Sequence, residues 1–294
     1  MNLLLLVNTH SGKGNGGEAA QKIIQHLEPK GWTIAIEESL HKDYFVDFLI
    51  KNKLENIDVI GVVGGDGTMF EVLNGLIKGN QNLEIPIILF PLGTGNAFNH
   101  DVGCLNLTEA LRRIEHPKTQ KIDIIRLKYY DKILYAYNIV GYGLVADINI
   151  TSEKLRWMGG LRYSVAALWH IFKNPKFEAK IEIDDIRFEG QFCFLLASNT
   201  IHTGKAMKMS PLAVLTDGLL DVIVVKHLPF WKLLQVFPLI YSGKHIHSPL
   251  LRYIHATKIK IEAAPQTLIV DGESYAKSSV VIDILPSLVT MVVG

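Results

Sequence analysis

Residues 59–68 read Val-Ile-Gly-Val-Val-Gly-Gly-Asp-Gly-Thr and are the most informative part of the sequence. The largely apolar run from Ile57 to Val63 is typical of a buried strand. Apolar residues at helical spacing follow from Met69 to Ile77, which predicts a helix directly after the glycine turn. Glycines let a ligand approach the backbone, and the first N–H groups of a helix carry a partial positive charge. The turn is therefore a candidate phosphate site, although a plain strand-to-helix turn would use the same residues.

A second glycine turn, at residues 91–96, supports the phosphate-site interpretation. Strands alternate with helices throughout this half of the chain, which predicts a parallel sheet with right-handed crossovers. The predicted strands are residues 3–7, 32–36, 57–63 and 85–90. Ligands bind at the carboxyl ends of such strands, where all the glycine loops fall. One shared site is therefore expected.

The pattern of predicted secondary structure changes after Lys121, where short strands separated by turn residues predominate. They include the stretches 122–129, 133–140, 177–183, 191–198, 219–225, 258–262, 267–270 and 280–285. This pattern favours an antiparallel sandwich, interrupted by helices near 163–172 and 230–241. We therefore predict an α/β protein with an N-terminal parallel-sheet nucleotide domain and a C-terminal antiparallel β-sandwich domain. The domains span residues 1–121 and 122–286, and the strand 287–294 can complete the first.

The amino-acid composition indicates a folded protein with a large core and argues against some classes of function. Apolar residues make up 48% of the 294-residue chain and charged residues 20%, so a large core is expected. The net charge is +1 without a long basic run, which argues against a nucleic-acid partner. Cys104 and Cys193 are far apart and are predicted to be buried thiols. No apolar run reaches the about 18 residues of a spanning helix, so we expect a cytoplasmic protein with at most peripheral contact at the inner membrane face.

Two other phosphate-binding patterns fit the sequence less well. Gly12, Gly14 and Gly17 form a formal G-x-G-x-x-G, but four residues separate them from the preceding strand, where the dinucleotide fingerprint needs a glycine almost at once. A Walker A loop is excluded because Gly14 follows Lys13 where Ser or Thr is required.

The motifs together resemble the catalytic domain of the diacylglycerol kinase family, which includes soluble bacterial lipid kinases and the sphingosine kinases. In the first half, the matching positions are Asn8, Ser11-Gly12, residues 64–68 and residues 91–96. In the second half they are residues 138–144, 159–163, 211–213, 216–221 and 271–273. The resemblance covers nearly the whole chain and implies a fold like that of the diacylglycerol and NAD kinases.

The chain departs from the family pattern at Thr9, at Phe70 and in the segment 199–204, which lacks a glycine cluster. These departures concern the shape of the acceptor site more than phosphoryl transfer.

The resemblance implies an ATP site and magnesium. The residues lining the ATP site would be Asn8, Ser39, Gly64, Gly65, Asp66, Gly67, Thr68 and Thr94. Asp66 could orient a magnesium ion or its waters, since magnesium prefers hard oxygen ligands. Asp217, with the main-chain carbonyls of Val214 and Leu219, would form a structural magnesium site. Asp217-Gly218 is also a strong hairpin-turn signal, so a plain turn is the alternative.

The resemblance also places the catalytic base in the turn 271–273. Asp271 and Glu273 are both candidates to take the proton of the lipid hydroxyl, and we favour Glu273. Asp66 completes the expected catalytic set. Lys13 and Arg162 could steady phosphate charge, but a solvated loop position is the simpler interpretation. His245 and His247 lack partners at metal-ligand spacing and are predicted to lie on the surface.

The resemblance implies an ATP-dependent lipid kinase that acts on diacylglycerol or a similar lipid and so serves lipid metabolism, including phospholipid biosynthesis. The expected partners are ATP, a lipid acceptor, a membrane surface and a second copy of the chain as a homodimer. One alternative is NAD-kinase-like phosphorylation of a soluble nucleotide. Another is a non-catalytic lipid sensor that binds ATP without turnover.

The segment 230–237 is apolar almost all round. It predicts either a helix packed between the two domains or a lip touching the bilayer. In the second case Phe230 and Trp231 would lie at the interface and Lys232 near anionic head groups.

Overall fold

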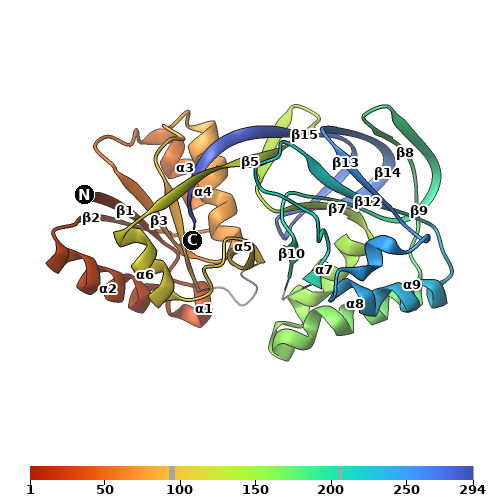
Figure 1. The fold of residues 1–294 in the computed structure, drawn as a ribbon, viewed down its shortest axis with the longest axis horizontal. Helices are drawn as coiled ribbons and strands as arrows, with labels where there is room; N and C mark the ends of the chain where they lie inside the picture. Colours follow the sequence, from red (N-terminus) through yellow and green to blue (C-terminus); the bar gives the residue numbers. More distant parts are fainter. Residues whose placement is uncertain (93–96, 205–206, 294) are drawn as a thin grey trace. The chain divides into compact units, whose positions relative to one another are not determined.

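The chain folds into two compact units in the computed structural model, which describes residues 1–92, 97–204 and 207–293. The first unit comprises residues 1–122 and 287–294, and the second comprises residues 123–286. The chain passes between them twice, within β5 (Lys118–Tyr129) and within β15 (Glu273–Val293). Figure 1 shows the course of the chain.

The first unit is built on a parallel sheet in the order β15-β4-β3-β1-β2. Its strands are β1 (Asn2–Val7), β2 (Thr33–Glu38), β3 (Val59–Gly64), β4 (Ile87–Pro91) and the end of β15. Its helices are α1 (Ser11–Gly14), α2 (Gly16–Leu27), η1 (Glu28–Lys30), α3 (Tyr44–Lys51), α4 (Asp66–Lys78), α5 (Ala97–Asp101) and α6 (Leu107–Glu115). Helices α2 and α6 lie on one side of the sheet, and α3 and α4 lie on the other (Figure 1).

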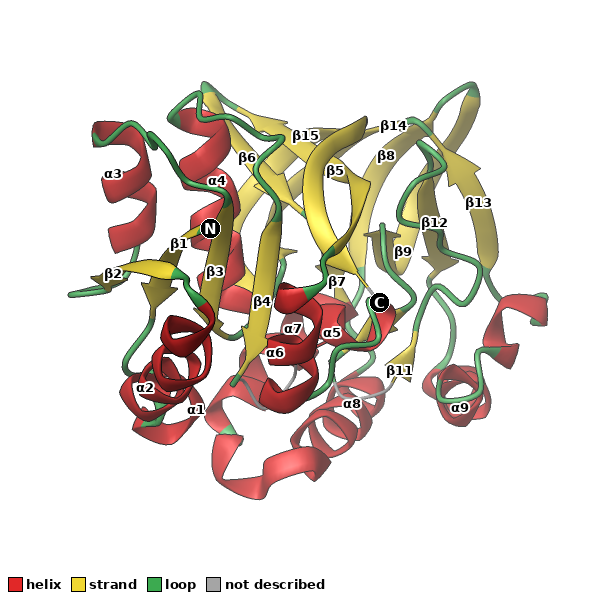
Figure 2. Cartoon of the chain, turned by 60° about the vertical axis from the view of Figure 1, so that its left-hand side comes forward, coloured by secondary structure: helices red, strands yellow, loops and turns green. Residues whose placement is uncertain are grey.

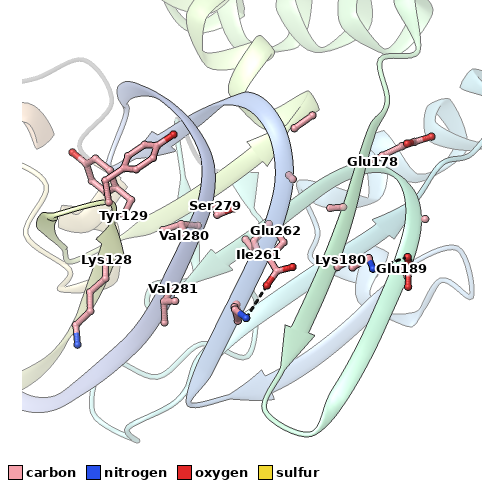
Figure 3. A pocket seen from close by; sticks show the side chains of 16 residues that line it. Lys128, Tyr129, Glu178, Lys180, Glu189, Ile261, Glu262, Ser279, Val280 and Val281 are labelled. Atoms are coloured by element: carbon pink, nitrogen blue, oxygen red, sulfur yellow. Dashed lines mark ion pairs between the residues drawn. The ribbon is translucent and has the colours of Figure 1, made fainter.

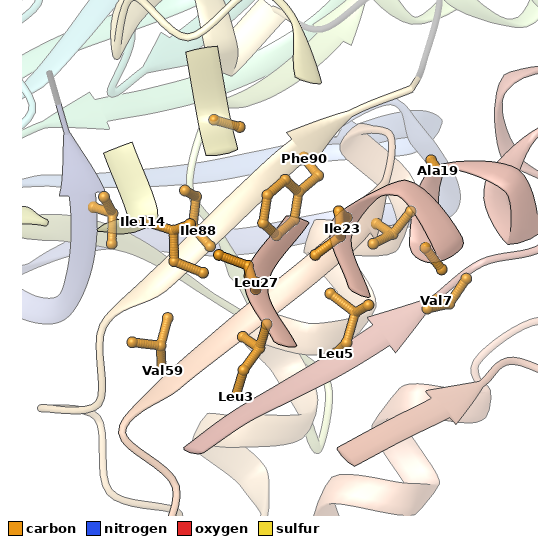
Figure 4. Close-up of a cluster of buried hydrophobic side chains, with 14 of the residues drawn as sticks. Leu3, Leu5, Val7, Ala19, Ile23, Leu27, Val59, Ile88, Phe90 and Ile114 are labelled. Carbon is orange, nitrogen blue, oxygen red and sulfur yellow. The ribbon is translucent and has the colours of Figure 1, made fainter. Parts of the chain in front are cut away.

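A hydrophobic core holds α2 and α6 against this sheet (Figure 4). Leu3, Leu5 and Val7 of β1 contribute to it, and all three are fully buried. Ile23 of α2 and Ile114 of α6 pack into the same cluster. Because helices cover both faces, β1 and β3 are continuous apolar runs rather than alternating ones. Burying each such side chain stabilises the fold by roughly 1.5–3 kcal/mol.

The second unit is mainly antiparallel, with strands in the order β13-β12-β9-β7-β14-β15 and with β8 between β9 and β14 (Figure 2). Its strands are β5, β6 (Lys132–Ala136), β7 (Ile139–Gly143), β8 (Phe177–Ile183), β9 (Ile186–Ser198), β10 (His202–Thr203), β11 (Met207–Lys208), β12 (Leu220–Lys226), β13 (Arg252–Ala256), β14 (Lys258–Val270) and β15. Its helices are α7 (Leu144–Lys154), η2 (Arg156–Leu161), α8 (Arg162–Lys173), α9 (Phe230–Val236), η3 (Phe237–Ile240) and η4 (Lys244–His247). The predicted fold class is confirmed.

Several predicted elements differ from those observed. The predicted strand 133–140 is two strands, β6 and β7, because the backbone between them bonds to a side chain distant in sequence, as described below. The stretches 258–262 and 267–270 are one strand, β14, with an irregular register between Glu262 and Gln266. The sequence patterns did not reveal α7, which begins after Gly143 at a positive φ of 70°. The glycine-rich residues 11–17 after β1 form α1 and the start of α2 rather than an extended loop.

Candidate active site

The carboxyl ends of four parallel strands meet at one edge of the sheet in the first unit. Val7, the last residue of β1, pairs with Glu38 of β2 and with Val63 of β3. Gly64, the last residue of β3, pairs with Pro91, the last of β4. The loops that follow these strands therefore start side by side, as the sequence pattern predicts for a ligand site.

Asn8 connects the loop after β1 to the first turn of α4. Its Nδ2 donates a hydrogen bond to Thr68 Oγ1 at 3.1 Å, and its Oδ1 accepts from the N–H of His10 at 3.1 Å. Its own N–H donates to the carbonyl of Val63 at 3.0 Å. One side chain thus fixes both the start of the loop and the helix of the glycine turn.

The glycine turn after β3 is tight because Thr68 folds back onto Gly64. A Cβ atom at Gly64 would lie 2.4 Å from Thr68 Oγ1, far inside contact distance. Gly65 precedes α4 in an extended conformation, and Asp66 is the first helical residue. The N–H groups at the start of this helix have no partner within it, and the helix dipole adds positive charge there. An anion such as phosphate is the natural ligand of this turn.

The loops after β1 and β4 lie close to the same turn. The N–H of Leu92 donates to the carbonyl of Gly64 at 3.1 Å. Gly12 approaches Leu92 so closely that a Cβ would lie 2.8 Å from the Leu92 carbonyl oxygen. Ser39 follows β2, is 9% exposed and donates its N–H to the carbonyl of Val7 at 2.9 Å. Of the residues predicted to line the ATP site, only Thr94 lies outside the described residues.

The two predicted carboxylates of the second unit have different environments. The carboxylate of Asp271 is 5% exposed and accepts the backbone N–H groups of Tyr137, Asn138 and Ile139 at 2.9, 3.0 and 2.8 Å. These bonds fix the backbone between β6 and β7, which explains why the strand is broken there. Glu273, two residues later, is half-buried at the start of β15.

A side chain on α7 supports the turn between these two carboxylates. Asn149 Nδ2 donates to the carbonyl of Gly272 at 2.8 Å. The turn itself has positive φ angles of 48° at Asp271 and 90° at Gly272. Aspartate tolerates this conformation better than most residues, and glycine adopts it without strain.

Two buried residues of this region, Asp123 and Asn199, were not predicted from the sequence. Asp123 is fully buried, and its Oδ2 accepts the N–H of Gly218 at 2.6 Å. Asn199 Nδ2 donates to the carbonyls of Asp123 and Tyr137 at 2.8 and 3.2 Å. The sequence signal for Asp123 is a single carboxylate inside the apolar run 122–125. Such a residue in a buried strand must be hydrogen-bonded.

The residues predicted to hold magnesium lie on the turn that Asp123 supports. Asp217 Oδ1 accepts the N–H of Leu219 at 3.0 Å, the bond of an Asx turn. Asp217 and Val214 are exposed. One carboxylate and two carbonyl oxygens fit a hard divalent cation in their chemistry. No group of three or more His, Cys, Asp and Glu side chains that could hold a metal is found in the described part of the chain.

Asp221 lies buried beside this turn. Its Oδ1 accepts the hydroxyl of Tyr253 and lies 3.3 Å from His255 Nε2. Burial raises the pKa of Asp221, and the negative charge of Asp217 raises it further. A cation bound at the turn would relieve this repulsion between carboxylates.

Two predictions about single residues are wrong. Arg162 is 8% exposed and lies 3.3 Å from Glu153 in an ion pair, so it is not a solvated loop residue. His245 is 1% exposed and donates its Nε2–H to the carbonyl of Met209 at 2.9 Å, whereas His247 is exposed as predicted. Both errors arise because tertiary packing can bury a polar side chain where another part of the chain offers it a hydrogen-bond or ion-pair partner. The side chain of Lys13 lies outside the described residues.

A cavity of about 980 Å³ opens on the second unit, lined by residues of β5, β8, β9, β14 and β15 (Figure 3). Its charged lining is mixed, and its ion pairs join Lys260 to Glu262 at 2.7 Å and Lys180 to Glu189 at 3.4 Å. None of the predicted site residues is among those that line it. The cavity therefore adds no charged group to the candidate site.

Both cysteines are buried free thiols, as predicted. Every helix in the described residues is too short or too polar to cross a lipid bilayer.

Sequence comparison assigns both halves of the chain to known protein families. The model of the diacylglycerol kinase catalytic domain matches residues 2–127. The model of the YegS C-terminal NAD kinase beta sandwich-like domain matches residues 138–293.

Individual relatives agree with these matches. Sphingosine kinase 2 of Arabidopsis thaliana is 26% identical over 88% of this chain, which spans 64% of the length of that protein. Diacylglycerol kinase of Bacillus subtilis is 24% identical over 92% of this chain and 88% of its own. A crystal structure from Bacillus anthracis str. Sterne, of a protein described as a "putative diacylglycerol kinase", superposes with a TM-score of 0.81 at 25% identity. It covers 100% of this chain and 97% of its own.

Proposed function

Because this chain belongs to the diacylglycerol kinase catalytic-domain family, we propose that it transfers the γ-phosphoryl group of ATP to a lipid hydroxyl. The resemblance inferred from the motifs is thereby confirmed. The observation that carries the activity is the shared edge where β1, β3 and β4 end beside the glycine turn that opens α4. The acceptor we propose is diacylglycerol or a similar lipid, so that the reaction would serve lipid metabolism, including phospholipid biosynthesis.

In this proposal the first unit binds ATP. Backbone N–H groups of residues 64–68 hold the phosphates, and the start of α4 supplies positive charge. Asn8 keeps the turn in shape through its bond to Thr68. Ser39 and Thr94 complete the nucleotide site in the roles that the family resemblance implies.

Magnesium, when bound, would neutralise the developing charge on the phosphate oxygens. Asp66 is the residue proposed to orient that ion, and its Oδ1 is shielded from solvent. The oxygens of Val214, Asp217 and Leu219 are proposed to hold a second, structural ion. Lysine and arginine are not required for either role, since magnesium prefers oxygen ligands.

Glu273 is proposed as the general base. The lipid hydroxyl oxygen forms a bond to the γ-phosphorus while the bond from that phosphorus to the β–γ bridging oxygen breaks and ADP leaves. The hydroxyl proton passes to the Glu273 carboxylate. The contacts of Asp271 favour this assignment, because its two oxygens already accept three backbone N–H groups. Asp271 is therefore proposed to position the turn rather than to take the proton.

A direct test incubates the protein with γ-labelled ATP, magnesium and a mixed lipid extract in detergent micelles, followed by chromatography of the products. A labelled lipid that disappears in Asp66→Asn and in Glu273→Gln supports the proposal. Conversion of NAD to NADP in a parallel reaction would favour the NAD-kinase-like alternative. Protection by ATP against thermal unfolding without any labelled product would favour the lipid sensor. An unaffected labelled lipid in both variants would contradict the site assignment.

A further inference from the structure

Helix α8 exposes a stripe of apolar side chains. Val165, Leu168, Trp169 and Phe172 are exposed and recur at the i, i+3, i+4 and i+7 spacing of one helix face. Trp169 and Phe172 expose 58% and 61% of their surface. The opposite face of the helix, with Ala166, Ala167 and Ile171, is buried. The helix is therefore apolar on both sides, and packing within the protein uses only one of them.

Neighbouring elements extend this stripe. On η2, Trp157 is 81% exposed and Leu161 is 66% exposed. On α9, which contacts α8, Trp231 is 55% exposed (Figure 1). A ring contact joins the two helices, since the centroids of Phe172 and Phe230 lie 5.5 Å apart. Within α9, the rings of Phe230 and Trp231 lie 5.3 Å apart. Three of the four tryptophans of the chain thus lie in this one region.

We call this surface the aromatic face. Its residues are Trp157, Leu161, Val165, Leu168, Trp169, Phe172, Phe230 and Trp231. Contiguous apolar surface of this kind marks a binding site in soluble proteins, whereas single exposed apolar residues do not.

The segments that form the aromatic face carry only positive charge. Residues 154–177 contain five Lys and Arg and no Asp or Glu, and α9 contains Lys232 and no Asp or Glu. The net charge of the whole chain is only +1, so acidic residues are concentrated elsewhere. Glu153, just before the first segment, is paired with Arg162. Lys173 lies with its Nζ 5.0 Å from the centre of the Trp169 ring, and Lys232 adjoins Trp231.

The charge distribution decides which partner fits. If two copies of the chain met through this face by a two-fold axis, their basic margins would meet each other and repel. An anionic bilayer is complementary instead, because Trp favours the head-group region, Phe and Leu enter the interface, and each nearby Lys or Arg adds electrostatic attraction. An apolar face bordered by lysines is typical of helices that lie in the plane of the membrane surface.

We propose that η2, α8 and α9 form the surface by which this protein binds anionic bilayers. The inference deepens the proposed function, since a lipid acceptor resides in a bilayer. It also widens the lip predicted from residues 230–237, because most of the aromatic face belongs to η2 and α8.

The test measures binding of the full chain to vesicles of phosphatidylcholine, alone or mixed with phosphatidylglycerol, by flotation. Wild type should bind the anionic vesicles, more weakly at high salt, and lipids brominated in their acyl chains should quench its tryptophan fluorescence. The triple variant Trp157→Ala, Trp169→Ala, Phe172→Ala should lose binding by about tenfold or more. The charge-reversal double variant Lys173→Glu, Lys232→Glu should also lose binding to the anionic vesicles, but not to vesicles of phosphatidylcholine only.

A matched control is Ile133→Ala with Ile186→Ala, which removes exposed apolar side chains from strands of the same unit. Circular dichroism and thermal unfolding confirm that each variant folds. The control should bind vesicles like wild type. Equal vesicle binding by the triple variant and by wild type would overturn the proposal. It would also be overturned if wild type self-associates and does not bind vesicles, while the triple variant is monomeric.

The outcomes also separate this inference from the proposed function. If the protein binds vesicles through the aromatic face but phosphorylates no lipid, the surface stands and the lipid kinase assignment fails. If it phosphorylates lipid dispersed in detergent but never binds vesicles, the kinase assignment stands and the surface is refuted. The triple variant should keep its activity toward detergent-dispersed lipid.

Discussion

Asp271 and Ile139 exchange two hydrogen bonds. Asp271 Oδ1 accepts the N–H of Ile139 at 2.8 Å, and the N–H of Asp271 donates to the Ile139 carbonyl at 2.9 Å. Together with the bonds from Tyr137 and Asn138, they commit the Asp271 carboxylate to holding the junction of β6 and β7. The neighbouring carboxylate, Glu273, is the one for which chemistry is proposed.

Asp271→Asn should therefore mainly lower stability, and Glu273→Gln should mainly lower the catalytic rate. An amide nitrogen at Asp271 cannot accept a backbone N–H, so unfolding free energy should fall by about 1–3 kcal/mol, measured by urea denaturation. Glu273→Gln should change stability less but lower kcat by about 10²–10⁴-fold, the usual contribution of a general base. Wild-type stability in Asp271→Asn, or wild-type activity in Glu273→Gln, would contradict these assignments.

Asn149 is expected to act as a positioning residue, because its side chain holds the Gly272 carbonyl beside Glu273. Asn149→Ala should lower kcat by about tenfold or more with little change in the KM for ATP, since a misplaced base costs rate rather than nucleotide binding. Steady-state kinetics with varied ATP measure both quantities. Thr151→Ala is the control on the same helix, because its hydroxyl contacts His170 instead of the turn. A raised KM for ATP with normal kcat would be inconsistent with this role.

The Asn8–Thr68 bond can be measured by a double-mutant cycle. Asn8→Ala and Thr68→Val should each lower stability, and the coupling between them should be about 0.5–1.5 kcal/mol. Both variants should also bind ATP more weakly in calorimetry. Asn106→Ala removes the side chain that caps α6 and should add independently to Thr68→Val. Additivity between Asn8 and Thr68 would show that the bond contributes nothing.

Gly64→Ala should disrupt the glycine turn. The new Cβ would lie 2.4 Å from Thr68 Oγ1, so the turn must shift, at about 1–3 kcal/mol of unfolding free energy and with weaker ATP binding. Gly17→Ala is the matched control, because a Cβ there meets nothing within 4 Å and the residue lies within helix α2. That change should be neutral or stabilising by up to about 1 kcal/mol. Thermal unfolding measures the stability of the two variants, and calorimetry measures their affinity for ATP. Equal effects of the two substitutions would refute the steric argument.

His245 should make stability depend on pH. Burial lowers the pKa of His245 in the folded protein below its usual value of 6.5. As pH falls below 6.5 the unfolded chain takes up a proton that the folded chain refuses, so the stabilising contribution of neutral His245 is lost in that window. His245→Gln, which can still donate to the Met209 carbonyl, should flatten the fall in stability below pH 6.5. Parallel curves for wild type and variant, from urea denaturation at several pH values, would show that His245 does not contribute.

The aligned strand ends of the first unit followed from local patterns. Each of β1, β3 and β4 is a short apolar run that ends in glycine or polar turn residues, and strand-to-helix alternation fixes a parallel sheet. The glycine turn at 64–68 was predicted for the same reason, since its conformation depends on residues adjacent in sequence. The second unit was predicted less well at its strand boundaries. There, bonds between distant segments, such as Asp271 to residues 137–139, override local preference.

Local patterns are sufficient to predict the alternation of strands and helices, the glycine turn and the family, because each depends on neighbouring residues or on the order of short motifs. Local patterns do not reveal that Asp271 is a buried anchor, that Asp123 and His245 lie inside the protein, or that α8 presents a second apolar face to solvent. These features depend on the fold, because burial and hydrogen-bond partners are set by which distant segments of the chain pack together. A sequence pattern specifies the period of an element but not what packs on each of its faces.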